Sequence, residues 1–235
     1  MRSHRNIESG NSHWIPLSDL MMGLMMVFML LAALYMLRVE QTTTLVVREY
    51  EVTKNDLQRA LQAEFAENFK EWDAELLGDM TIRFRNPDVL FATGSDKLRP
   101  AFQNILDQFF PRYLAILTQE PYKGAIKEIR IEGHTSQFWT TATSPIDAYL
   151  RNMTLSQART RSTLEYLLRS PQTQAHLNWV RERVTANGLS SSKPILVSGD
   201  IDDQASQRVE FRIVTNAEER LAKMAQAIAT QASAQ

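Results

Sequence analysis

Residues 14–37 form an apolar segment, WIPLSDLMMGLMMVFMLLAALYML, which is long enough to cross a lipid bilayer. The hydrocarbon core of a bilayer is about 30 Å thick and requires roughly 20 apolar residues in a helix. The segment contains one acidic residue, Asp19, and no basic residue. A carboxylate within hydrocarbon costs at least ~2.5–3.5 kcal/mol on insertion scales, which makes it a candidate functional group. The segment therefore predicts a transmembrane helix in which Asp19 is an ion-translocating residue.

Asp19 also has a structural interpretation. A carboxylate is favourable in the first turns of a helix, and a side chain near the membrane surface can extend to the interface. Gly23 lies one turn further along the same face, where a small residue lets a neighbouring helix or water approach the acid. We expect the methionines of the segment to serve packing and lipid contact rather than metal binding.

The leader, residues 1–13, contains Arg2 and Arg5. Positive charge before a span favours a cytoplasmic location, so the leader is expected in the cytoplasm. The apolar segment is longer than the 7–15 residues of a signal-peptide core, which argues against cleavage. The sequence therefore predicts a single-pass inner-membrane protein with a cytoplasmic N-terminus and a periplasmic C-terminal domain.

Residues 38–78 are predicted to form a helical linker. Apolar residues recur there at every third or fourth position, as in an amphipathic helix: Leu57, Leu61, Phe65, Phe69, Trp72 and Leu76. The spacing is not a regular heptad, so two interpretations stay open. The stripe could form a coiled coil between two copies of the chain, or the helix could fold back on the domain that follows.

Residues 79–215 alternate between strand-like and helix-like patterns and predict one compact domain. Strands are expected at residues 81–84, 126–133, 194–197 and 208–215, helices at 101–117, 155–168 and 173–183, and a surface loop at 137–149. This order predicts an α+β fold, a sandwich of helices packed on a β-sheet. Residues 216–235 are predicted to form an alanine-rich helical tail.

Composition argues against several functions. The chain has 26 basic and 27 acidic residues, so no net field favours nucleic acid. It has no cysteine and no phosphate-binding loop. Ser156, His134 and Asp147 could be considered as a hydrolase triad, but no nucleophile elbow surrounds Ser156. Glu132 and His134 alone are too few for a metal site. We expect no enzymatic activity, no cofactor and no metal.

Five segments, in order, resemble the OmpA-like domain, also called the OmpA/MotB C-terminal peptidoglycan-binding domain. They are VLFATGSDKLRP (89–100), IRIEGHT (129–135), NMTLSQARTRSTLEYL (152–167), NG (187–188) followed by PI (194–195), and QRVEF (207–211). The membrane segment resembles that of flagellar stator B subunits, whose aspartate carries the driving ion. Together with the long helical linker, the layout resembles the MotB-like membrane subunit of an anti-phage defence system.

The resemblance implies binding of the diaminopimelate-containing peptide of peptidoglycan. It assigns Thr135, Asn152, Leu155 and Arg159 to the peptidoglycan site. The ligand carries carboxylates, and a guanidinium forms paired, charge-assisted hydrogen bonds with such groups. Arg159 matches that role.

One position departs from the family pattern. The family usually reads EGHTD, whereas this chain has Ser136 in place of the acid that would meet the ligand's ammonium group. Asp147, in the predicted loop that follows, is a candidate replacement.

The sequence as a whole predicts an ion-driven stator subunit. Two copies would stand within a ring of a MotA-like membrane partner in the lipid bilayer, while the folded domain binds peptidoglycan. Each charge that crosses a potential of 100 mV releases about 2.3 kcal/mol. The expected output is anti-phage defence, and the alternatives are a flagellar-type stator B subunit or a passive tether between membrane and cell wall. Either H⁺ or Na⁺ could be the ion.

Overall fold

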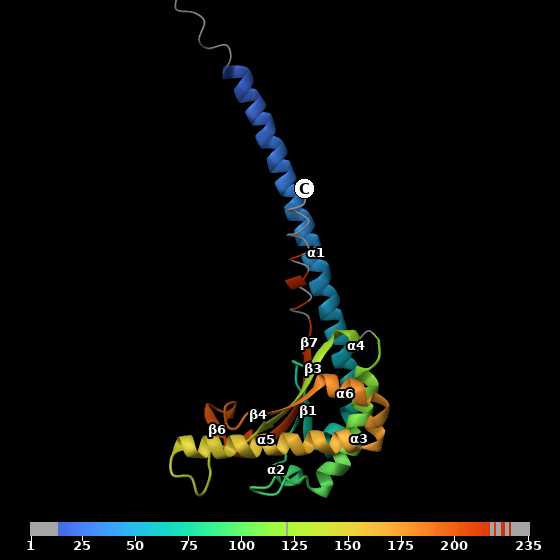
Figure 1. Ribbon diagram of the computed structural model, residues 1–235, viewed down its shortest axis with the longest axis vertical. Helices are drawn as coiled ribbons and strands as arrows, with labels where there is room; N and C mark the ends of the chain where they lie inside the picture. Colours follow the sequence, from blue (N-terminus) through green and yellow to red (C-terminus); the bar gives the residue numbers. More distant parts are fainter. Residues whose placement is uncertain (1–13, 121, 217–218, 220–221, 224–225, 227–235) are drawn as a thin grey trace, which may run out of the picture. The chain divides into compact units, whose positions relative to one another are not determined.

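The computed structural model describes residues 14–120, 122–216, 219, 222–223 and 226. The chain divides into two units, one of Met1–Tyr50 with Leu221–Gln235 and the other of Glu51–Arg220. Helix α1 (Trp14–Glu71) contributes residues to both units (Figure 1). The predicted leader and most of the predicted tail lie outside the described residues.

The first unit contains the membrane segment. Within the described part of the chain, one helical stretch, Ser18–Val39, is long and apolar enough to cross a membrane, with 22 residues and a mean hydropathy of 2.4. None of this stretch is buried by the rest of the chain. Its large apolar side chains, from Leu20 to Leu37, are exposed. A helix that is apolar around its whole circumference suits a lipid environment.

The second unit is built on a five-stranded sheet with the strand order β1-β2-β7-β3-β4. The strands are β1 (Ala74–Leu76), β2 (Thr81–Phe84), β3 (Ile126–His134), β4 (Val184–Gly188) and β7 (Arg208–Thr215). Strands β3 and β4 run parallel, and the other neighbouring pairs run antiparallel. Parallel neighbours need a crossover connection, which includes helix α5 (Pro145–Arg169).

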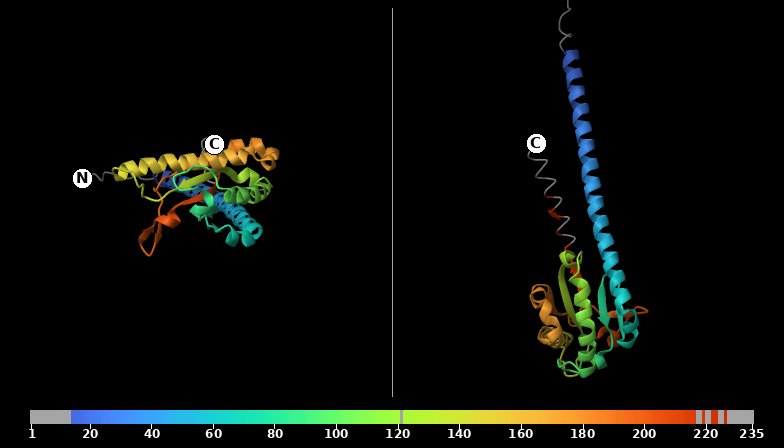
Figure 2. Two further views of the ribbon diagram at one scale, coloured as in Figure 1. Left: turned by 90° about the horizontal axis from the view of Figure 1, so that it is seen from below. Right: turned by 90° about the vertical axis from the view of Figure 1, so that its right-hand side faces the viewer.

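Helices α3 (Pro100–Leu117) and α5 cover one face of the sheet (Figures 1 and 2). The shorter helices are α2 (Pro87–Leu90), α4 (Tyr122–Ala125), the 3₁₀ helix η1 (Pro171–His176), α6 (Leu177–Arg183) and α7 (Asp203–Ser206). Strands β5 (Ile195–Val197) and β6 (Asp200–Asp202) form a separate hairpin. The predicted α+β fold, with an apolar N-terminal helix, a helical linker and helices on a sheet, is confirmed.

The second half of the linker helix packs on the domain core. Leu57, Leu61 and Phe65 are at most 3 % exposed. The ring centroids of Phe65 and Phe109 lie 5.3 Å apart, and Phe109 in turn lies 5.1 Å from Phe211 on β7. Burying such side chains stabilises the fold by roughly 1.5–3 kcal/mol each. The apolar stripe is therefore buried within one chain. At these positions the helix folds back on the domain and does not form a coiled coil.

Two local expectations were wrong. Helix α5 begins at Pro145, inside the expected surface loop, because the Ser144 hydroxyl caps it by accepting a hydrogen bond from the Asp147 amide (3.1 Å), and proline suits the first helical position. The helical linker predicted for residues 38–78 ends as a helix at Glu71, and residues 74–76, with Leu76 among them, form β1 because they pair with β2. Strand β4 was not predicted, since it is short and lacks apolar alternation. The strand predicted at residues 194–197 is present as β5, and it pairs with β6 in the separate hairpin rather than with the five-stranded sheet.

Candidate functional site

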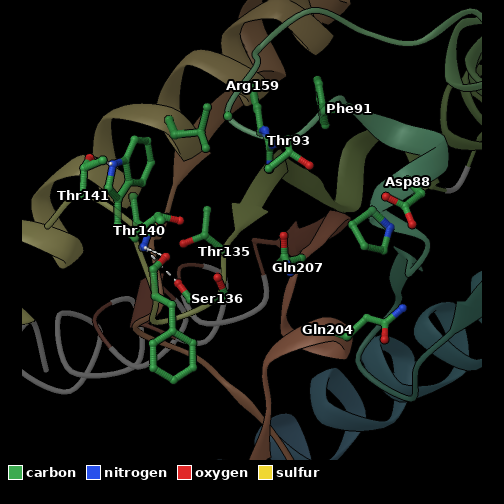
Figure 3. Close-up of a pocket in the computed structure, with 16 residues that line it drawn as sticks. Asp88, Phe91, Thr93, Thr135, Ser136, Thr140, Thr141, Arg159, Gln204 and Gln207 are labelled. Atoms are coloured by element: carbon green, nitrogen blue, oxygen red, sulfur yellow. Dashed lines mark hydrogen bonds between the residues drawn. The ribbon is translucent and has the colours of Figure 1, made fainter.

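A pocket of about 590 Å³ opens where β3 ends and α5 passes (Figure 3). Its lining comes from four segments that are distant in sequence: Pro87, Asp88, Phe91, Thr93, Gly94, Thr135, Ser136, Phe138, Trp139, Thr140, Thr141, Asn152, Leu155, Arg159, Gln204 and Gln207. All four residues that the resemblance assigns to the peptidoglycan site are among them. The fold thus brings the predicted site residues together in one cavity.

Arg159 extends from α5 to the wall formed by the 91–95 segment. Its Nε donates a hydrogen bond to the Ser95 carbonyl oxygen (2.9 Å), and its Nη2 donates to the Ala92 carbonyl oxygen (3.1 Å). The guanidinium carbon lies 5.0 Å from the centroid of the Phe91 ring. Among the described residues, no group accepts a hydrogen bond from Nη1, so this nitrogen is available to a ligand.

The loop that holds Arg159 depends on a glycine. Gly94 has φ = +69°, a left-handed conformation that glycine adopts without strain. The turn there lets the carbonyl groups of residues 92 and 95 both accept hydrogen bonds from the Arg159 guanidinium. Burial lowers the pKa of Arg159, and the charge of Asp96 opposes this effect. The guanidinium nevertheless stays protonated because its pKa starts so high.

Thr135 and Asn152 have different functions in the pocket. Thr135 is 3 % exposed, and its Oγ1 is buried without a hydrogen-bond partner in the described structure. An unpaired buried polar group costs about 1–3 kcal/mol, so a ligand atom that bonded to this hydroxyl would recover that energy. Asn152 donates from Nδ2 to the carbonyl oxygens of Ser136 (3.1 Å) and Phe138 (3.2 Å). Asn152 therefore positions the 136–138 loop.

Two glycines let α5 approach the sheet closely enough to form the pocket. A Cβ atom on Gly133 would lie 2.7 Å from Thr160 Cγ2, and one on Gly188 would overlap the Gln157 backbone nitrogen. Gly133 and Gly188 are paired neighbours on β3 and β4. Because the helix lies directly on them, the face of α5 that carries residues 152, 155 and 159 is held at the end of β3.

Asp147 does not line the pocket. Its carboxylate accepts hydrogen bonds from Arg151 Nε (2.8 Å) and from the Thr143 amide (3.0 Å). These bonds hold the pKa of Asp147 below the usual value, and the bond from Arg151 has the larger effect. The suggested replacement for the missing acid is therefore not supported. Asp88, which directly precedes the VLFATG motif, lines the pocket, and only the packing of α2 against the site reveals it.

A buried charged cluster lies on the opposite sheet face from α5. His134 Nε2 is 3.3 Å from Glu210 Oε2 and 4.0 Å from Glu132 Oε2. Arg83 Nε and Arg208 Nε each lie 2.7 Å from Glu210 Oε1. The β3–β7 register places Glu210 opposite Glu132, a pairing that the local sequence does not reveal. The two carboxylates and the imidazole lie close enough to share a metal, but the two arginines already supply positive charge at Glu210.

The cluster shifts the pKa values of His134 and Glu210. Burial lowers the pKa of His134, although Glu210 opposes this effect. Burial alone would raise the pKa of Glu210, but the adjacent His134 imidazole and the Arg208 charge hold it far below the usual value. The cluster therefore favours a neutral imidazole beside an ionised carboxylate. We interpret it as a structural ion network.

Asp19 lies on α1 in the first unit. Its side chain is exposed in the single chain, and it has no hydrogen bond or ion pair with the described residues. A Cβ on Gly23, one turn away, would meet nothing within 4 Å. The described part of the chain thus provides neither a partner nor a cover for this carboxylate.

These features define a class of protein in which an apolar N-terminal helix is joined to an α+β domain with an arginine-containing pocket. No protein-family model matches the chain. The chain is 45 % identical over 224 residues to the Zorya protein ZorB of Escherichia coli strain Crooks, covering 93 % of this chain and 94 % of that protein. The chain therefore belongs to the ZorB family of Zorya proteins.

Three solved structures show lower similarity to this chain. The cell wall anchor of the T6SS from Pseudomonas aeruginosa is 21 % identical, with a TM-score of 0.46, and covers 66 % of this chain and 96 % of its own. A protein described as MotB-like from Desulfovibrio vulgaris is 20 % identical, with a TM-score of 0.48, and covers 74 % and 98 %. The periplasmic domain of Helicobacter pylori MotB is 16 % identical, with a TM-score of 0.43, and covers 64 % and 85 %.

Proposed function

We propose that this chain is an ion-driven stator subunit of an inner-membrane Zorya motor that acts in anti-phage defence. The observation that carries the proposal is the presence, in one chain, of an apolar helix with an unpartnered carboxylate and a domain whose pocket gathers Thr135, Asn152, Leu155 and Arg159. The pocket would hold the subunit to the cell wall, and Asp19 would take up and release the driving cation.

Wall binding would use two donors that have no hydrogen-bond partner among the described residues. Arg159 Nη1 and Thr135 Oγ1 can both donate to a ligand carboxylate, and Leu155 offers an apolar contact beside them. The guanidinium is already fixed by two carbonyl groups and the Phe91 ring. Little side-chain entropy is then lost when a ligand binds.

Replacing Arg159 tests wall binding. Arg159→Ala should weaken co-sedimentation of the full-length protein with purified sacculi by about 10- to 100-fold, since hydrogen bonds to charged groups contribute about 1.5–3 kcal/mol. Arg161→Ala is the matched control, because Arg161 is exposed on the same helix and does not line the pocket. Equal binding by the Arg159 variant and the control would refute the site.

Replacing Asp19 tests ion coupling. Asp19→Asn should abolish ion flux and phage protection while the protein stays in the membrane and on the wall, because an amide cannot exchange a cation in the same way. Ser18→Ala, one residue away and also exposed, should keep both activities. A protective Asp19→Asn variant would favour the passive tether instead.

The partners and topology follow from the same proposal. Residues 1–13 would be the cytoplasmic leader, 14–37 the span, 38–78 the linker, 79–215 the peptidoglycan-binding domain and 216–235 the tail. Two copies would place their exposed apolar helices within a ring of the MotA-like partner ZorA, which would cover the Asp19 carboxylate that the described residues leave exposed. Co-purification of the chain with ZorA from membranes, in a ratio that includes two copies of this chain, is the expected result.

A further inference from the structure

The lining of the pocket carries two opposite charges. Among the lining residues, Arg159 is the one cation and Asp88 the one anion. Figure 3 shows Asp88 on the side of the pocket opposite Thr140 and Thr141, with Arg159 and Thr135 between them. The Asp88 carboxylate is exposed and accepts no hydrogen bond from the described residues. A charged acceptor is therefore open to the cavity.

Short-range bonds fix the position of Asp88. The Asn86 side chain accepts a hydrogen bond from the Asp88 amide (3.2 Å), and Pro87 occupies the first position of α2. At the other end of α2, the Phe91 amide donates to the Pro87 carbonyl oxygen (3.1 Å). Phe91 is also the ring that lies against Arg159. The anion and the cation of the pocket are thus held by one short structural unit.

The ligand class that fits this pair is a zwitterion. The free stereocentre of diaminopimelate bears a carboxylate and an ammonium group on the same carbon. Arg159 and Thr135 offer donors for the carboxylate, but Ser136, at the position of the usual acid, offers only a neutral hydroxyl. An ammonium group that loses water needs an acceptor, and an ionised one forms the stronger hydrogen bond.

We propose that Asp88 binds this ammonium group and so replaces, from a different segment, the acid that is missing at position 136. The assignment rests on the proposed peptidoglycan function. It makes Asp88 a specificity-determining residue, which selects a third peptide residue with both charges over one with a single charge.

Calorimetry on the full-length protein in detergent micelles tests the assignment. The probes are tripeptides L-Ala–γ-D-Glu–X, where X is meso-diaminopimelate, 2-aminopimelate, which lacks the second ammonium, or lysine, which lacks the second carboxylate. The wild type should bind the diaminopimelate peptide about tenfold more tightly than the aminopimelate peptide. Asp88→Asn should bind these two peptides equally, because the ammonium then has no charged partner.

Asp96→Asn is the matched control. Asp96 is an exposed acid whose charge acts on Arg159, but it does not line the pocket. This variant should keep the tenfold preference. An Asp88→Asn variant that also keeps it would overturn the assignment, even if Arg159→Ala had lost binding to all three peptides. Unchanged peptide binding by Arg159→Ala would instead refute the proposed function, so the two failures can be told apart.

Discussion

Two carboxylates in this chain have opposite surroundings. Glu210, in the domain, is 5 % exposed and is bonded to Arg83 and Arg208 and paired with His134. Asp19, in the membrane helix, is exposed and has no partner among the described residues. A buried carboxylate with charged partners holds a structure together, because its removal leaves those charges uncompensated. A carboxylate without partners among the described residues of its chain is open to a mobile ion or to another subunit.

The strongest test of this contrast is the removal of Glu210. Glu210→Ala should lower the free energy of unfolding by about 3–5 kcal/mol, because Arg208 would stay buried without its counter-charge. Urea unfolding of the full-length protein in detergent, followed by tryptophan fluorescence, measures the change. Glu165→Ala is the control, since Glu165 forms an exposed ion pair with Arg169 and such pairs contribute about 0–1 kcal/mol. Equal losses would mean that burial does not set the importance of Glu210.

A smaller loss is expected when the contact between α5 and the sheet is disturbed. In Gly188→Ala the added methyl would overlap the Gln157 backbone, and overpacking of this kind costs about 1–3 kcal/mol. Because α5 carries Arg159, binding to sacculi should weaken together with stability. Gly124→Ala, where a Cβ would meet nothing within 4 Å, should change neither. Normal stability and wall binding in Gly188→Ala would contradict the close packing.

The buried cluster should also make stability depend on pH. Burial lowers the pKa of His134 in the folded state, so the unfolded chain takes up a proton near pH 6.5 that the folded chain resists. Stability should therefore fall as the pH decreases below about 6.5. The pKa of Glu210 is also lowered on folding, so its contribution is present above about pH 4.5 and is lost below it.

Thermal unfolding between pH 7.5 and about pH 2.5, in steps of about half a unit, would show both effects. In His134→Asn the loss of stability that begins below about pH 6.5 should be absent. His176→Asn, which alters a partly exposed histidine, should keep this loss. An unchanged pH dependence in His134→Asn would show that another group is responsible.

The smallest effect on stability is expected at Asp19. Asp19→Asn removes no contact within the described structure, so the free energy of unfolding of the domain should change by less than ~0.5 kcal/mol, as for an unpartnered surface position. Urea unfolding by the same method measures this value. A large loss would show that Asp19 has a structural partner, which would remove the contrast with Glu210.

Local patterns predicted much of this fold. The α3 helix, β2, β3 and β7 follow from apolar periodicity, and the apolar helix of the first unit follows from length and hydropathy alone. The start of α5 was missed because a Ser-Pro cap resembles a loop boundary. Strand β4 was missed because its sequence, VTANG, gains its conformation from pairing with β3.

Some residues of the candidate site could be found from the sequence, and others only from the tertiary structure. The motif around Arg159 and the segment ending in Thr135 are local, so the sequence by itself was enough to show the resemblance to the OmpA-like domain, and it was this resemblance that assigned the two residues to the site. The sequence by itself also showed the lone acid in the apolar segment, Asp19. Asp88 and Glu210 were found only in the tertiary structure, because helix packing and strand register bring together residues far apart in the chain. The use of the linker's apolar stripe was likewise decided by packing, since a helical period shows which face is apolar but not which surface covers it.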